Sequence, residues 1–130
     1  MNRFAFLEME EVVGKIKFFK LSIDGDIEYD EFENTCKANP KDMDSLVGIL
    51  RYMNRKSNLE KVPPGKYKSL DNKGENLKTF EFKKDNLRVY GMTRPGGKII
   101  VFGAKKGTQN KDIKRIKSIA KEIIKRNLEP

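Results

Sequence analysis

The side chains that could do chemistry in this chain are lysines and arginines, and they are concentrated in its second half. From residue 66 to the end there are 18 Lys and Arg against 7 Asp and Glu, a net charge of +11; residues 1–65 carry 10 against 12, or −2. The chain has no histidine and one cysteine, Cys36. Ser/His and Cys/His catalytic pairs, the usual zinc spacings and an intramolecular disulfide are therefore excluded. A basic half of this kind indicates a phosphate-bearing partner.

Most of these cations fall on or beside a predicted run of strands. They are interleaved with two tyrosines, which could stack on the bases of single-stranded RNA or could cap the edge of the core. The candidates are Lys66, Tyr67, Lys68, Lys78, Lys83, Lys84, Arg88, Tyr90, Lys98, Lys105 and Lys106. Alternation along a strand over 87–93 places Arg88 and Tyr90 on one face. A structural ion pair between Arg88 and Glu81, across a hairpin, is an equally good interpretation of the spacing.

Length and composition predict a single domain over residues 1–130. An apolar fraction of 37% is enough for one core, and a charged fraction of 36% predicts a well-solvated surface. The apolar cluster at residues 4–7 is too short for a secretory signal or a membrane span, so we expect a cytoplasmic protein with no membrane partner. We also expect residues 1–10 to be an extension that the domain does not require.

The first half is expected to supply one strand and two helices. Residues 12–21 are rich in β-branched and aromatic side chains and predict the strand. A helix is predicted over 29–37, where an Asn-Pro pair follows and ends it. The second helix should begin at Asp42 or Asp44 and end near residue 57, with an apolar stripe that packs on a sheet.

The second half predicts three strands and a closing helix. The strands are expected at 77–84, 87–93 and 98–104, joined by a hairpin turn and by a Pro-Gly-Gly turn. The last of them should lie centrally, because four of its residues are apolar without alternation. The helix beyond residue 110 places Ile inward and Lys outward. The predicted fold is an α+β domain, a three- to five-stranded antiparallel curved sheet packed against two N-terminal helices and one C-terminal helix.

One stretch, LKTFEFKKDNLRVYGMTRPGGKIIVFGAKKGTQNKDIKRIKSIAKEII, has a recognisable order of residues. It contains, in order, a strand with LRVY, a Gly-rich turn, an apolar strand that runs into AKKGTQ, and a closing helix of Ile and Lys. This order resembles the C-terminal half of the RelE/ParE toxin superfamily, in particular its HigB-like members. The resemblance covers roughly residues 60–127 and implies a RelE-like fold.

The resemblance implies the toxin of a type II toxin-antitoxin pair, a ribosome-dependent mRNA interferase that uses neither metal nor cofactor. In such enzymes the 2′-hydroxyl of the message attacks the adjacent phosphate, and protein cations stabilise the transition state. By position, Arg88 matches the strand arginine that binds the scissile phosphate, and Lys105 and Lys106 match the basic exit of the central strand. Glu81 would serve as a base or a positioning group. Message-backbone contacts would come from Lys66, Lys68, Lys78, Lys83 and Lys84, with Tyr67 and Tyr90 beside them.

The implied partners are messenger RNA on the ribosome and a cognate antitoxin, expected to be a helix-turn-helix protein, with promoter DNA bound only through that antitoxin. Two other functions are alternatives. One is a ParE-like inhibitor of DNA gyrase; such inhibitors lack the catalytic cations, so Lys105 and Lys106 argue against it. The other is a non-catalytic nucleic-acid-binding module, whose affinity falls steeply with salt. Membrane-surface binding by the last helix is disfavoured, because its inner face has no Trp or Phe anchor.

Overall fold

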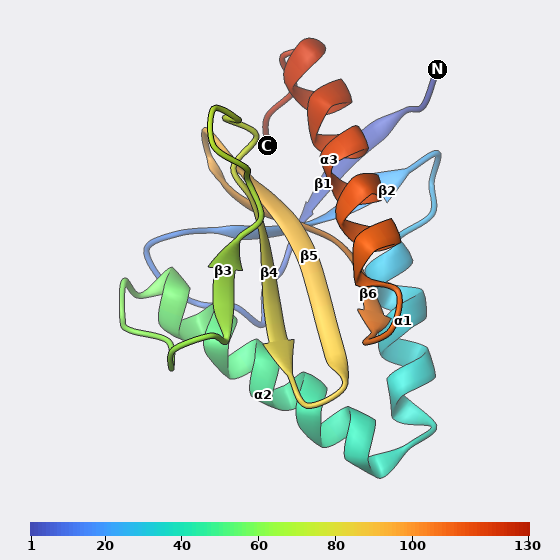
Figure 1. Ribbon diagram of the computed structural model, residues 1–130, viewed down its shortest axis with the longest axis vertical. Helices are drawn as coiled ribbons and strands as arrows, with labels where there is room; N and C mark the ends of the chain where they lie inside the picture. The colour runs from blue at the N-terminus through green and yellow to red at the C-terminus, as the bar shows by residue number, and fades with distance from the viewer.

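The fold is built on a six-stranded sheet that carries helices on both faces (Figure 1). The computed structural model describes residues 1–130. The strands are β1 (Phe4–Glu8), β2 (Phe18–Ile23), β3 (Tyr67–Ser69), β4 (Thr79–Lys84), β5 (Leu87–Arg94) and β6 (Gly97–Lys105). The helices are α1 (Glu28–Lys37), α2 (Pro40–Ser57) and α3 (Gln109–Lys125). None of the helices has the length and apolar composition that crossing a membrane requires.

The strand order across the sheet is β1-β2-β6-β5-β4-β3. All neighbours are antiparallel except β2 and β6, which run parallel. The α+β class with two N-terminal helices and a C-terminal helix is confirmed, but the expected purely antiparallel sheet of three to five strands is wrong. The extra strands are β1 and β3, which occupy the two edges of the sheet. The parallel partners β2 and β6 are separated in the chain by α1, α2 and strands β3–β5, as a parallel connection requires.

The helices α1 and α2 cover one face of the sheet, called here the α2 face. Helix α2 begins at Pro40, so the expected start at Asp42 or Asp44 is wrong. The Asn39 side chain caps the helix by accepting hydrogen bonds from the amides of Lys41 and Asp42, and Pro40 occupies the first turn. The buried core on this face contains Met9, Val12, Phe18, Tyr29, Cys36, Leu46, Ile49, Met53, Phe80, Phe82, Leu87, Val89 and Ile100. The sheet side chains on this face fix the position of α2 against β4 and β5.

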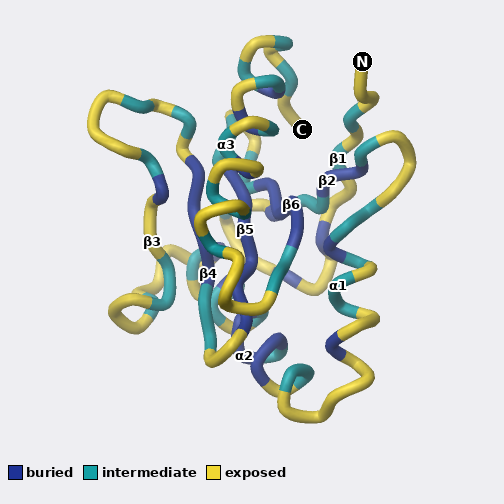
Figure 2. Tube along the Cα trace, turned by 45° about the vertical axis from the view of Figure 1, so that its right-hand side comes forward, coloured by how far each residue is buried: buried dark blue, intermediate teal, exposed yellow.

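Helix α3 covers the opposite face, called here the α3 face. Its apolar stripe, which contains Ile116, Ala120 and Ile123, is buried against the sheet. The second core contains these three residues with Leu21, Leu70, Tyr90, Met92, Ile99, Val101 and Phe102. Figure 2 shows the result: β4, β5 and β6 are buried along most of their length, while the connecting loops are exposed. The expectation of a central strand covered on both faces fits β6.

The N-terminal segment departs most from the sequence-based expectation. The strand predicted over 12–21 begins only at Phe18. The reason is that Ile16 is tied to the end of α2, where its amide and carbonyl bond to the carbonyl and hydroxyl of Ser57 at 2.9 and 2.6 Å. Residues 4–8, part of the extension that the domain was expected not to require, pair with β2 through five residues as the edge strand β1.

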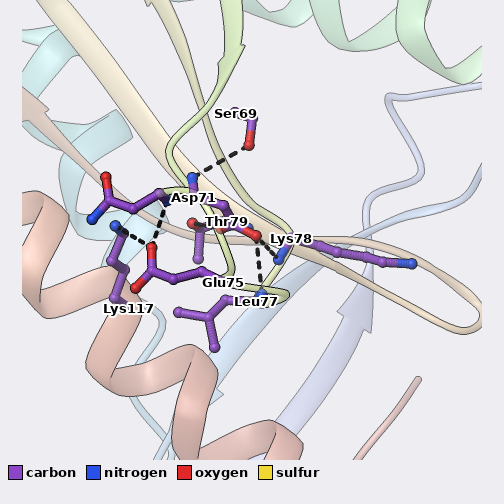
Figure 3. A network of polar contacts seen from close by, with 8 residues as sticks. Ser69, Asp71, Glu75, Leu77, Lys78, Thr79 and Lys117 are labelled. Carbon is purple, nitrogen blue, oxygen red and sulfur yellow. Dashed lines mark hydrogen bonds and ion pairs between the residues drawn. The ribbon is translucent and has the colours of Figure 1, made fainter.

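The segment between β3 and β4 is organised by the carboxylate of Asp71 (Figure 3). One oxygen accepts the amides of Leu77 and Lys78 at 3.0 and 2.8 Å, and the other accepts the amide and hydroxyl of Thr79 at 3.0 and 2.6 Å. Partial burial by itself raises the pKa of Asp71, but these hydrogen bonds outweigh it and lower the pKa below its usual value. The loop therefore holds β3 in place beside β4.

Candidate nucleic-acid interface

Several of the predicted site residues share the α3 face, at the end of the sheet near the β4–β5 turn. Residues directly opposite each other in a ladder point to the same side of a sheet. Lys68 pairs with Glu81, Glu81 with Tyr90, and Lys83 with Arg88. Since Tyr90 belongs to the core under α3, all five side chains originate on that face.

Arg88 is the unusual member of this group, because it is a nearly buried charge without a counter-ion. Its exposed fraction is 9%, and no carboxylate lies within ion-pair distance of it. Its Nη1 donates to the carbonyl oxygens of Asp85 and Leu87, both at 2.9 Å, and these are its only hydrogen bonds. The Nε and Nη2 donors are left without protein partners. Neither nitrogen is among the fully buried polar atoms that lack a partner, so both are open to solvent or to an anion. A cation with this little exposure and no counter-ion is well placed to bind an anion.

Glu81 does not pair with Arg88, so the structural ion pair considered from the sequence is absent. Its carboxylate binds Lys68 instead, with Oε1 3.1 Å from Nζ. Glu81 is 3% exposed and its Oε2 has no hydrogen-bond partner. Because Lys68 itself is largely exposed, the pair places an ammonium group at the surface above a buried carboxylate. This arrangement suits Glu81 to positioning Lys68 rather than to direct contact with a ligand.

Two further lysines extend the row of cations that contains Arg88. Lys83 lies directly opposite Arg88, and its amide donates to the carbonyl of Lys66 at 2.9 Å. Lys66, Lys83 and Arg88 therefore lie at one level on three neighbouring strands or their ends. Neither lysine has a carboxylate within 4.0 Å. The three residues are called here the basic row. None of them is in an ion pair, although the charge of Lys66, after the larger effect of the hydrogen bond from Ser45, helps to lower the pKa of the nearby Asp85 carboxyl.

Lys105 is not part of this row, which corrects the expected cluster of Arg88 with Lys105. It pairs with Leu87 in the ladder, points to the α2 face and forms an ion pair with Asp42 at 3.1 Å. The cause is a β-bulge: Tyr90 pairs with Phe102 and Gly91 with Ile100, so Val101 is an extra residue in β6. Without it the register would pair Arg88 with Gly103, and Lys105 would share the Arg88 face.

Lys106 lies one residue beyond β6. Its side chain is exposed, and its amide donates to the carbonyl of Asn86 at 2.7 Å beside the β4–β5 turn. Lys84 points to the α2 face, where its methylenes pack against Gly48. Lys78 stands at the far end of β4, with its amide on Asp71. Lys84 and Lys106 both lie near the hairpin end that carries Arg88, but Lys84 is on the other face of the sheet, and Lys78 lies at the opposite end of β4.

The two tyrosines are buried to different extents. Tyr90 is fully buried, with its ring 5.1 Å from that of Phe102 and its hydroxyl without a partner, and burial raises its pKa. In this structure its ring is not exposed to a base. Tyr67 is half-buried on the α2 face between Phe80 and Phe82, and burial raises its pKa to about 12. Neither ring adds a stacking surface to the basic row.

The basic row can bind and stabilise anionic oxygens, with Arg88 as its most buried donor. No group of three or more Cys, Asp or Glu side chains is placed so that it could hold a metal ion.

Comparison with known proteins finds no matching protein family, no matching curated protein and no matching solved structure. Sequence reasoning found every cation of the row but could not detect the bulge that removes Lys105.

Proposed function

We propose that this protein is a metal-independent endoribonuclease that cuts messenger RNA, the activity implied by its resemblance to the RelE/ParE toxins, with Arg88 holding the scissile phosphate. The observation that carries the proposal is the nearly buried Arg88 guanidinium, which has two free donor positions and no carboxylate. A phosphate accepts two parallel N–H donors from such a group and supplies the missing negative charge.

The lysines beside Arg88 support a polymer rather than an isolated phosphate. Neighbouring strands lie about 4.8 Å apart, so cations at one level of adjacent strands can follow a nucleic-acid backbone that crosses them. Lys83 and Lys66 supply that row, and the exposed ammonium of Lys68 lies one level away. A single strand suits this surface, because the row is short and lies beside α3.

In the proposed reaction the 2′-oxygen of one nucleotide attacks the phosphorus, and the bond from phosphorus to the 5′-oxygen breaks. The products are a 2′,3′-cyclic phosphate and a free 5′-hydroxyl. The proton of the 2′-hydroxyl passes to water, and a lysine ammonium, with Lys83 nearest to Arg88 in the ladder, supplies the proton to the leaving oxygen. Arg88 contributes by stabilising the extra negative charge of the transition state, which is usually the largest catalytic term. Glu81 orients Lys68 through their ion pair.

The test is to map cleavage by primer extension on a translated message, with and without ribosomes, for the wild type, Arg88→Ala and Arg88→Lys. The wild type is expected to cut, and Arg88→Ala to lose about 10²-fold or more, the usual loss for one transition-state donor. Arg88→Lys should recover only part of the rate, because an ammonium cannot form the two parallel bonds. Equal cleavage by the wild type and Arg88→Ala removes Arg88 from the proposed role.

The same experiment separates the other two functions. Salt-sensitive RNA binding without cleavage by the wild type would identify a non-catalytic binding module. Inhibition of gyrase supercoiling without RNA cleavage would identify a ParE-like inhibitor. As part of the proposal we expect an acidic antitoxin partner, of the helix-turn-helix class, since a net charge of +9 favours association with a negatively charged protein. Promoter DNA would then be bound through that partner.

A further inference from the structure

A second cluster of cations surrounds a cavity on the α2 face, away from the basic row. The cavity has a volume of about 400 Å³ and lies where the end of α2 and the segment after it approach β6. Its lining residues are Ile16, Lys56, Leu59, Glu60, Lys61 and Lys98. Three lysines and one glutamate give this lining a net charge of +3 − 1 = +2. Such a lining attracts an anion, and a doubly charged one most strongly.

Lys98 is the deepest cation of the cavity. Its Nζ donates to the Tyr67 hydroxyl at 3.0 Å and to the Thr93 hydroxyl at 2.9 Å, and no carboxylate lies within 4.0 Å. It also lies 5.3 Å from the ring centroid of Tyr67 and 5.0 Å from that of Phe80. An ammonium has three donors, so one remains for a ligand. Two neutral hydroxyls and two rings hold the group in place without neutralising it.

The surroundings of Lys98 are unfavourable to its charge. Burial, followed by repulsion from Lys56 and Lys78, lowers the pKa of Lys98 to about 8. Lys56 contacts the Tyr67 ring, which Lys98 also contacts, with its Nζ 4.0 Å from the ring centroid. Glu60 is the one carboxylate in the lining, and it has no ion pair with any of the lysines. An anion between Lys56 and Lys98 would relieve the repulsion between them.

We propose that this cavity binds a phosphate monoester or inorganic phosphate, held by Lys98 from the sheet, by Lys56 near the end of α2 and by Lys61 in the segment after it. The dianion matches the net charge of the lining. Ile16 and Leu59 provide an apolar wall beside it, which leaves room for the organic part of a monoester. The site lies on the other face of the sheet from Arg88, so it is independent of the RNA contact proposed above.

Phosphate binding should depend on pH in both directions. The charged groups around the ligand are Lys98 on β6, Lys56 on α2, Lys61 and Glu60 after α2, and Lys78 beside β4. Affinity should fall as the pH rises through the Lys98 pKa of about 8, where the ammonium loses its proton. It should also fall below about pH 6, where a phosphate monoester gains its second proton.

The probe is inorganic phosphate, titrated by calorimetry into the full-length protein at pH 7 and constant ionic strength. The wild type is expected to bind saturably with one site per chain. Lys98→Met and Lys56→Gln should each weaken binding about tenfold or more, the loss expected when a charged hydrogen bond is removed. Lys121→Gln, an exposed α3 lysine without an ion pair, is the matched control and should bind as the wild type does.

A second measurement covers the case in which a variant is destabilised. In wild-type protein with isotopically labelled lysine, the NMR titration of Lys98 should move to higher pH when phosphate is added, while Lys121 does not move. Arg88→Ala should keep both the binding and the shift, which separates this site from the proposed RNA contact. No saturable binding by the wild type, an unshifted Lys98, or equal loss in Lys121→Gln would each overturn the proposal.

Discussion

Replacing Asp71 tests whether one carboxylate organises the β3–β4 connection. Asp71 accepts four hydrogen bonds, from Leu77, Lys78 and twice from Thr79. Asn keeps one acceptor oxygen but turns its NH₂ group toward donors, so at least two of the four bonds are lost. At about 1 kcal/mol for each bond on a half-exposed residue, Asp71→Asn should cost about 2 kcal/mol. For a chain of this length that corresponds to a fall in Tm of about 6–10 °C.

The stabilising effect of Asp71 should also depend on pH. The pKa of Asp71 in the folded protein is lowered, so its stabilising effect is complete above the unfolded value of about 3.9 and is lost as the pH falls through the folded pKa. The difference in unfolding free energy between the wild type and Asp71→Asn should therefore be constant near neutrality and shrink in acid.

Urea unfolding at pH 7 and at decreasing pH measures both effects. Asp26→Asn is the control, because its side chain is exposed and has no hydrogen bond or ion pair. The reasoning is refuted if Asp71→Asn unfolds at the same urea concentration as the wild type, or if its deficit at neutral pH persists unchanged at pH values below the folded pKa.

Two further predictions concern the sheet. Gly91→Ala would bring a Cβ within 2.2 Å of the Ile99 carbonyl oxygen and 2.7 Å of the Phe80 ring beside the bulge. Thermal unfolding should therefore show a loss of stability of about 1–3 kcal/mol or more, and an unchanged Tm would contradict this prediction. Deleting residues 1–8 removes β1 and leaves backbone groups of β2 unpaired, so light scattering should detect self-association. A monomer as stable as the full chain would show that β1 is dispensable, as the sequence suggested.

Local signals in the sequence predicted local structure well. Asn39 and Pro40 mark the break between α1 and α2, although the cap of α2 is Asn39 and not Asp42 or Asp44. Asp85 and Asn86 mark the turn of the β4–β5 hairpin. These features depend on residues near one another in the chain, where capping and turn chemistry decide the outcome. The basic row on β4 and β5 follows from the same hairpin, because its register fixes which side chains share a face.

Non-local features could not be predicted in the same way. The parallel pairing of β2 with β6 depends on packing between segments more than 70 residues apart, which no local pattern encodes. The bulge at Val101 is a feature of the pairing between β5 and β6 that no local pattern marks, and this one extra residue moves Lys105 to the other face. The environment of Lys98 could not be predicted either, because the sequence does not distinguish it from the other lysines. Its contact with Tyr67, and the position of Lys56 on the same ring, arise only in the folded protein.

Arg88 on the α3 face is proposed to bind the scissile phosphate, whereas Lys105 on the α2 face is not. The two residues are separated by measuring the rate of cleavage at a mapped site in a translated message for Arg88→Ala and for Lys105→Ala, with folding of both variants checked by thermal unfolding. Lys105→Ala removes an ion pair on the α2 face between an exposed ammonium and the mostly buried Asp42 carboxylate. The loss should lower stability, but the folded variant should cut about as fast as the wild type, because Lys105 lies on the other face from Arg88. Arg88→Ala should be slower by about 10²-fold or more. Equal rates for the two variants, or a larger loss in Lys105→Ala, would contradict the proposed role of Arg88.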